Sequence, residues 1–138
     1  MRLTLTPIVE QLRTGFRQVE GVLEFSRQDT PPRTLPALFV VPASEAAQAN
    51  KLAGARDQVV DVGFAVMLVV DGARRNAAGI AEDLSIEGEK VKALLTGWRH
   101  PQASRACDFV RASLASASGS IVVWDMRFTA RYHIRQPS

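Results

Sequence analysis

The apolar and polar residues alternate most regularly near the C-terminal end of the chain, in the segment SIVVWDMRFTARYHIR at residues 120–135. One set of alternate positions is apolar throughout: Val122, Trp124, Met126, Phe128, Ala130, Tyr132 and Ile134. From residue 125 on, the other set is polar or charged: Asp125, Arg127, Thr129, Arg131, His133 and Arg135. Successive side chains of a strand point to opposite faces. The pattern therefore predicts a long strand with one face on a core and the other toward water or a partner.

Further segments have the character of strands. Residues 58–71, QVVDVGFAVMLVVD, are mostly apolar on both alternating faces, which predicts a central strand of a sheet. Residues 37–42, ALFVVP, are branched, apolar and bounded by prolines, which predicts a buried strand. Residues 107–114, CDFVRASL, are strand-like, and residues 22–26, VLEFS, are considered as a short additional strand.

Apolar residues at helical spacing predict two helices. The first covers residues 6–21, with Ile8, Leu12, Phe16 and Val19 on one face. Thr6 is expected to cap its amide end, and Pro7 suits the first helical position because it has no N–H to satisfy there. The second helix covers residues 80–95 and places these residues on one stripe: Ile80, Leu84, Val91, Leu94 and Leu95. Gly97 is suited to end it.

The order of these elements predicts an α+β fold. We expect a mostly antiparallel or mixed sheet with two main helices packed against it, in a single domain over residues 1–138. Residues 43–57 and 71–79 are rich in small residues, and we expect them to be loops that become ordered on assembly.

Composition narrows the class of protein only a little. The chain has 138 residues, of which 46% are hydrophobic and 22% charged, as in a globular domain. Its 17 Lys and Arg against 14 Asp and Glu leave a net charge of +3, too small to indicate nucleic-acid binding. The single cysteine and the lack of a long apolar run predict a soluble protein of the cytoplasm.

A search for catalytic chemistry finds no phosphate-binding loop, dinucleotide fingerprint, nucleophile elbow or paired-cysteine metal spacing. A lone cysteine beside apolar residues, such as Cys107, is typical of a small buried side chain. The alternative is a small enzyme or ligand-binding module that uses Cys107, His100 and Arg99, with the first two as a nucleophile pair.

Four segments in sequence order carry a resemblance to a known family. They are PALFVVP followed by AN, the long segment QVVDVGFAVMLVV, a helix that runs into LLTGWRHP, and the closing WDMRFTARYHIR. In this order they resemble the tail terminator, or tail completion, proteins of long-tailed bacteriophages, especially those of Mu-like contractile-tailed phages and related prophages. The likeness covers residues 1–135.

The resemblance implies an α+β subunit of a hexameric ring that caps the finished tail tube, stops its polymerisation and prepares the joining of the head. It implies copies of the same chain and the tail tube protein as partners, with the sheath and the head–tail connector beside them. Neither a membrane nor specific nucleic-acid binding is expected, although genome DNA would pass through the ring. No catalytic residue, cofactor or metal is expected, and the protein would act in the host cytoplasm during assembly and then in the virion tail.

Residues 94–110, LLTGWRHPQASRACDFV, are then interpreted as a structural corner between a helix and a strand. Trp98 is expected to anchor it, with Arg99, His100 and Arg105 forming a basic rim. We expect Trp98→Ala to destabilise the fold more than replacement of Cys107, and replacement of His100 to have the smallest effect.

The candidate interface combines one strand face with the loops. The polar face of the last strand contributes Asp125, Arg127, Thr129, Arg131 and His133. The loops and the corner contribute Lys51, Arg56, Arg74, Arg75 and Arg99. Mixed charges on such a surface can match a neighbour and exclude wrong partners.

Overall fold

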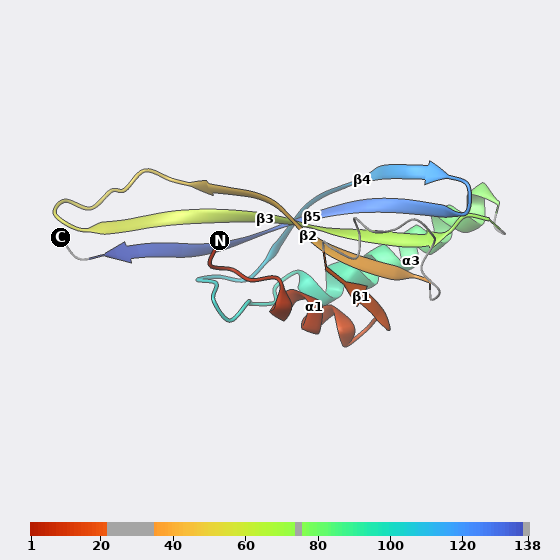
Figure 1. Ribbon diagram of the computed structural model, residues 1–138, viewed down its shortest axis with the longest axis horizontal. Coiled ribbons are helices and arrows are strands. Elements are labelled where there is room, and N and C mark those ends of the chain that lie inside the picture. The colour runs from red at the N-terminus through yellow and green to blue at the C-terminus, as the bar shows by residue number, and fades with distance from the viewer. Residues whose placement is uncertain (22–34, 74–75, 137–138) are drawn as a thin grey trace.

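Five strands form one mixed sheet in the order β1-β2-β3-β5-β4 in this computed structural model, which describes residues 1–21, 35–73 and 76–136 (Figure 1). The two central strands, β3 (Arg56–Asp71) and β5 (Ile121–Gln136), pair antiparallel along their whole length. β2 (Ala37–Ala47) pairs antiparallel with β3, and β4 (Asp108–Ser118) with β5. β1 (Gln18–Glu20) runs parallel to β2. The predicted central position of residues 58–71 is confirmed.

Two helices, α1 (Thr6–Arg13) and α3 (Ala77–Leu95), pack against one face of this sheet, which confirms the α+β class (Figure 1). Asn76 caps the start of α3, because its side chain accepts a hydrogen bond from the backbone N–H of Gly79 at 2.8 Å. It ends before Gly97, whose φ of +84° is a conformation that glycine adopts without steric cost. In the part of the chain that the structure describes, no helix is long and apolar enough to span a membrane.

The main core lies between the helices and the sheet. Its members from β3 occupy alternate positions, as the sequence predicts: Val60, Val62, Phe64, Val66, Leu68 and Val70. The apolar positions of β5, from Val122 to Tyr132, face the same core. A smaller cluster of Ala37, Phe39, Val69 and Val123 is buried on the opposite face. The sheet is therefore apolar on both faces at one end only.

The other end of the sheet extends beyond the helices, and we call it the distal end (Figure 1). Here the N-terminal segment and the loop before β4 complete the core, because Leu3 and Ala103 are buried with Val60, Val62 and Tyr132. The loop is joined to β5 by a hydrogen bond from the N–H of Ser104 to the carbonyl of Arg131 at 2.8 Å. The core-facing side of β5 is thus covered both by the helices and, at the distal end, by the N-terminal segment and the loop before β4.

The edge strand β4 is irregular. Its register against β5 shifts between Phe109 and Arg111 and again between Leu114 and Ser116. Val110 and Leu114 are exposed large apolar side chains on this strand. Bulges of this kind twist a strand and break its hydrogen-bond ladder.

The helix predicted for residues 6–21 is too long, since α1 ends at Arg13 and Val19 lies in β1. Thr6 is not its cap; Leu5 holds that position without a side-chain hydrogen bond. Gly15 lies where a Cβ atom would be 2.9 Å from Leu94 of α3, so the chain turns at the point where the two helices meet. Tertiary packing outweighs the helical spacing of the residues that follow.

The predicted loops at 43–57 and 71–79 are also too long. Residues 43–47 belong to β2, which continues past a register shift between Pro42 and Ser44. Residues 56–57 belong to β3, and residues 77–79 are the first turn of α3. Backbone pairing with β3 overrides the weak strand preference of alanine, serine and glutamate. The strand considered at residues 22–26 lies outside the described residues, and the ordering of the loops on assembly stays a prediction.

Candidate functional site

The polar face predicted for β5 exists, but its charges are largely paired within the chain. Arg127 donates two hydrogen bonds to Asp125 on the same strand, each of 2.8 Å. Arg131 donates one of 2.8 Å to Asp61, which lies directly opposite on β3. Thr129 stands between these pairs, opposite Gly63. The face therefore presents paired positive and negative charges in fixed positions, and its arginines are not unpaired.

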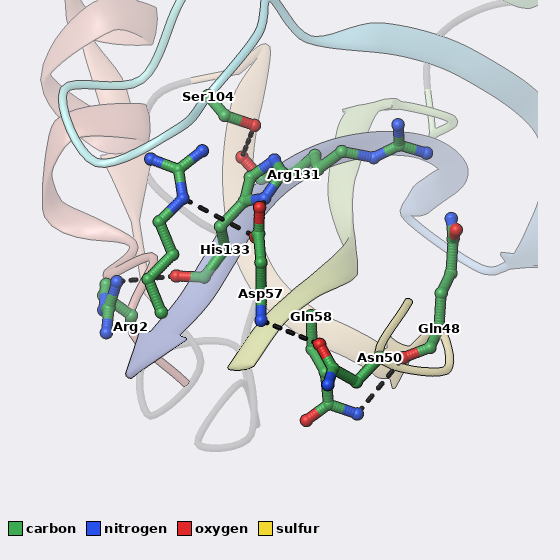
Figure 2. Close-up of polar contacts among 9 residues, drawn as sticks. Arg2, Gln48, Asn50, Asp57, Gln58, Ser104, Arg131 and His133 are labelled. Atoms are coloured by element: carbon green, nitrogen blue, oxygen red, sulfur yellow. Dashed lines mark hydrogen bonds and ion pairs between the residues drawn. The ribbon is translucent and has the colours of Figure 1, made fainter. Parts of the chain in front are cut away.

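The same pairing continues to the distal end, where β3 begins and β5 ends. The imidazole Nδ1 of His133 lies 2.7 Å from an Asp57 carboxylate oxygen. Arg135 Nε lies 3.5 Å from the same oxygen. Figure 2 shows Arg2 beside His133, where it donates a 2.9 Å hydrogen bond to the His133 carbonyl. In Figure 2 the side chain of Arg131 extends away from Arg2.

These contacts lower the pKa of both β3 carboxylates. The hydrogen bond from His133 is the main cause for Asp57, and the hydrogen bond from Arg131 is the main cause for Asp61. The hydrogen bonds with Asp125 raise the pKa of Arg127 in turn. Tyr132 has a raised pKa because burial disfavours its anion and because its hydroxyl donates to Glu45 at 2.9 Å.

Replacing Asp61 with asparagine should remove part of the acid sensitivity of the fold. The folded-state pKa of Asp61 lies below its ordinary value of 3.8, so its ion pair stabilises the protein above about pH 4 and loses that effect as the pH falls further. Urea unfolding between about pH 5 and about pH 3 should show a smaller loss of stability in Asp61→Asn than in the wild type. Glu82→Gln, on the exposed surface of α3, serves as control. Equal acid slopes for Asp61→Asn and the wild type would contradict the assignment.

The corner at residues 94–110 is confirmed as a structural turn. Two backbone hydrogen bonds close it, from Gly97 N–H to the Cys107 carbonyl at 2.9 Å and from Cys107 N–H to the Trp98 carbonyl at 2.7 Å. Trp98 is half-buried against the core, and its ring meets that of His100 edge-on at 5.8 Å. Arg99 and Arg105 are exposed, as the predicted basic rim requires.

His100 does not belong to that rim, and the prediction that placed it there is wrong. Its side chain is fully buried, and it is the one buried polar or charged residue among those the structure describes. The Gln102 N–H donates to Nδ1 at 3.0 Å, so Nε2 carries the proton and donates to the Thr4 carbonyl at 2.8 Å. Both ring nitrogens are therefore engaged with the backbone, and the ring holds the N-terminal segment against the corner.

Cys107 is also fully buried, as predicted for a structural cysteine. Burial raises the pKa of its thiol to about 11, and the nearby Asp108 carboxylate adds to the shift. A nucleophilic cysteine needs the opposite, a lowered pKa and access to solvent. The geometry gives the Cys107–His100 nucleophile pair no support, because both ring nitrogens of His100 form hydrogen bonds with backbone groups.

Cys107 should react slowly with thiol reagents in the folded protein. With a pKa of about 11, roughly one thiol in a thousand is ionised at about pH 8, and that thiol is covered. Labelling with iodoacetamide, followed by mass spectrometry, should be slow in buffer and fast in denaturant. Rapid labelling of the native protein would show that Cys107 is accessible and would reopen the enzyme alternative.

The remaining residues of the candidate interface fall at different places. Lys51 and Arg56 are exposed at the distal turn between β2 and β3, and Arg99 donates from Nε to the Ala103 carbonyl at 3.1 Å. Arg74 and Arg75 lie outside the described residues. Sequence reasoning missed Arg2, Asp57 and Asp61 as partners of the β5 face. The alternation of β3, which places Asp57 and Asp61 on one face, is the signal that could have identified the two carboxylates.

No group of three or more metal-ligating side chains occurs among residues 1–21, 35–73 and 76–136. A groove of about 300 Å³ crosses the open face of the sheet, between Ala43 and Ser44 of β2 and Val110 and Arg111 of β4. The geometry provides ordered charge of both signs, shallow hollows and an exposed, irregular strand edge.

Comparison with known proteins agrees with this geometry. The chain has the fold of a chain in the virion of a native gene transfer agent particle, with a TM-score of 0.54 and 20% sequence identity over 91% of this chain and 90% of the other. No curated protein matches it. The family model of the phage tail terminator protein matches residues 1–138. The chain therefore belongs to the phage tail terminator family.

Proposed function

We propose that copies of this chain form a hexameric ring that caps the tail tube, ends its polymerisation and prepares the tail for joining to the head. Family membership gives the chain a structural role in a phage tail, and the match over residues 1–138 is the observation that carries the proposal. The tail tube protein lies on one side of the proposed ring, and the sheath and head–tail connector lie next to it. Assembly takes place in the host cytoplasm, and the ring then stays in the virion tail, where genome DNA passes through it.

The architecture supports a ring of identical copies. Contacts that close a ring join two different surfaces of the same subunit. In the described part of the chain, the sheet ends at β4 on one side, while β1 covers only Ala37–Phe39 of β2 on the other. The exposed half of β2 and the irregular edge of β4 are thus unlike surfaces at opposite edges of one sheet, as a head-to-tail contact requires.

We further propose the open face of β5 as part of the contact between subunits or with the tube. The ion pairs of Arg127 and Arg131 are partly exposed, and each is expected to contribute only about 1 kcal/mol to stability. Their fixed geometry is suited to matching the charges of a neighbour. Lys51, Arg56 and Arg99 lie at exposed positions from which they can extend the same contact.

Deletion of the gene from a phage that depends on it tests the function. Electron microscopy should show tails of irregular and excessive length that do not join heads, because nothing ends the growth of the tube. The wild-type gene supplied in trans should restore uniform tails. Tails of normal length and normal head joining in the deletion strain would refute tail capping.

Charge reversal on the β5 face tests the interface. The Arg127→Glu/Arg131→Glu protein should fold but lose ring formation and tail capping, since its charges then oppose those of its partner. A second variant, Asp61→Arg/Arg131→Asp, exchanges two paired residues, so it keeps the ion pair within the chain and the net charge but reverses the position of the two charges on the face. If the position of the charges matters, native mass spectrometry and tail length should show the same defect in this variant. Normal assembly of both proteins would exclude the face from the interface.

A further inference from the structure

A hollow of about 430 Å³ at the distal end of the sheet includes three arginines in its lining, and we call it the basic hollow. Arg2, Arg99 and Arg135 contribute guanidinium groups, His133 an imidazole ring, and Gln102 and Ser104 further polar groups. The residues come from the N-terminal segment, the loop before β4 and the end of β5. Three segments that are far apart in sequence therefore converge on one positively charged site.

The positive charge of the basic hollow is not balanced within the described chain. Two carboxylates lie near it, and both already have partners: Asp57 contacts His133 and Arg135, and Glu45 accepts a hydrogen bond from the Tyr132 hydroxyl. Neither Arg2 nor Arg99 forms an ion pair among the described residues; both contact backbone carbonyls instead. Like charges held close together raise the free energy of the folded state. A ligand of opposite charge would remove that cost.

Two of the guanidinium groups are held in place before any ligand arrives. Arg2 lies over the ring of Tyr132 at 5.3 Å and donates to the His133 carbonyl at 2.9 Å. Arg99 donates from Nε to the carbonyl of the buried Ala103 at 3.1 Å. Each guanidinium has five N–H donors, so these contacts leave several for a ligand. Preorganised donors bind an anion with a smaller loss of side-chain entropy.

We propose that the basic hollow binds carboxylate groups on an acidic segment of a neighbouring protein. A guanidinium matches a carboxylate or a phosphate in two parallel hydrogen bonds. A nucleic acid needs a continuous positive track, but beyond the hollow the surface alternates in sign at Asp57, Asp61 and Asp125. The ring of Tyr132 is buried and covered by Arg2, so it offers no surface for a base to stack on. A short acidic segment of a protein fits this pattern of charge, and a long nucleic acid does not.

A labelled oligoglutamate peptide added to the isolated protein at low ionic strength tests this inference. It goes beyond tail capping, so its outcome is independent of any result on tail length. We expect Arg99→Glu/Arg135→Glu to weaken peptide binding at least about tenfold, since charge-assisted hydrogen bonds are lost. Arg135→Glu alone, at a side chain that is 69% exposed, should weaken binding without affecting the fold. Amide resonances of residues 132–135 and of residues 99–104, except Pro101, should shift on titration with the peptide.

The matched control is Arg17→Glu/Arg111→Glu, which changes the net charge equally at exposed positions outside the hollow. It should bind the peptide nearly as well as the wild type. An equal loss in the control would show that net charge alone attracts the peptide and would overturn the proposal. A DNA duplex whose binding depends on the hollow, with peptide binding unaffected by the same variants, would assign the site to nucleic acid instead.

Discussion

Phe128→Ala should lower the free energy of unfolding by about 3–5 kcal/mol, the largest effect expected of the substitutions considered. The Phe128 side chain is 1% exposed and lies at the centre of the main core. Its ring stacks on that of Phe64 at 5.7 Å and meets that of Phe109 edge-on at 5.4 Å. Removal of the ring leaves a cavity between β3, β4 and β5, which the paired strands cannot collapse to fill. Urea unfolding at neutral pH measures the effect.

Phe109→Ala is the control for this prediction, because Phe109 is only partly buried at the edge of the same cluster. It should cost clearly less than Phe128→Ala. A loss below about 1 kcal/mol for Phe128→Ala would mean that the strands repack around the vacated space, contrary to the close packing of the core.

His100→Ala should lower the free energy of unfolding by about 2–4 kcal/mol, although the sequence suggests that replacement of His100 matters least. The substitution removes a fully buried ring and leaves the Thr4 carbonyl and the Gln102 N–H without their partner. Unsatisfied polar groups add their desolvation cost to that of the cavity. The N-terminal segment should also loosen, which hydrogen exchange of residues 1–5 would detect.

His133→Ala is the matched control, since this histidine contacts the Asp57 carboxylate with a side chain that is 21% exposed instead of fully buried. Surface pairs contribute about 0–1 kcal/mol, so this variant should be nearly as stable as the wild type. If the two histidine variants prove equally stable, the buried hydrogen bonds of His100 do not stabilise the fold as argued.

The strands and the faces of β3 and β5 were predictable because their signal is local. Alternation over residues 120–135 fixes which side chains of β5 face the core whatever the rest of the chain does. Gly97 likewise carries its own signal as the residue that ends α3. The predicted ends of helices and strands were wrong where contacts between residues distant in sequence set them. Gly15 lies against Leu94 at the end of α1, and the second half of β2 is a strand because it pairs with β3.

The candidate site depends more on distant contacts, so less of it could be predicted. The β5 residues were correctly placed on one polar face, but the pairing of Arg131 with Asp61 depends on a register between residues 70 positions apart. The role of His100 depends on Thr4, 96 positions away. Periodicity within a segment carries no information about such pairs. For the same reason, the convergence of Arg2, Arg99 and Arg135 on one hollow became visible only in the folded chain.

The two register shifts in β4 have a consequence for a protein proposed to end a polymer. An exposed, regular strand at the edge of a sheet is a template on which further chains can add without limit. In β4 the ladder is interrupted at Phe109–Arg111 and at Leu114–Ser116, so an incoming straight strand finds matching donors and acceptors only over short stretches. The edge of β4 is therefore a poor template for adding a further strand to this sheet. For a chain that ends the tail tube, as proposed above, this irregular edge keeps the capping subunit from starting growth of its own.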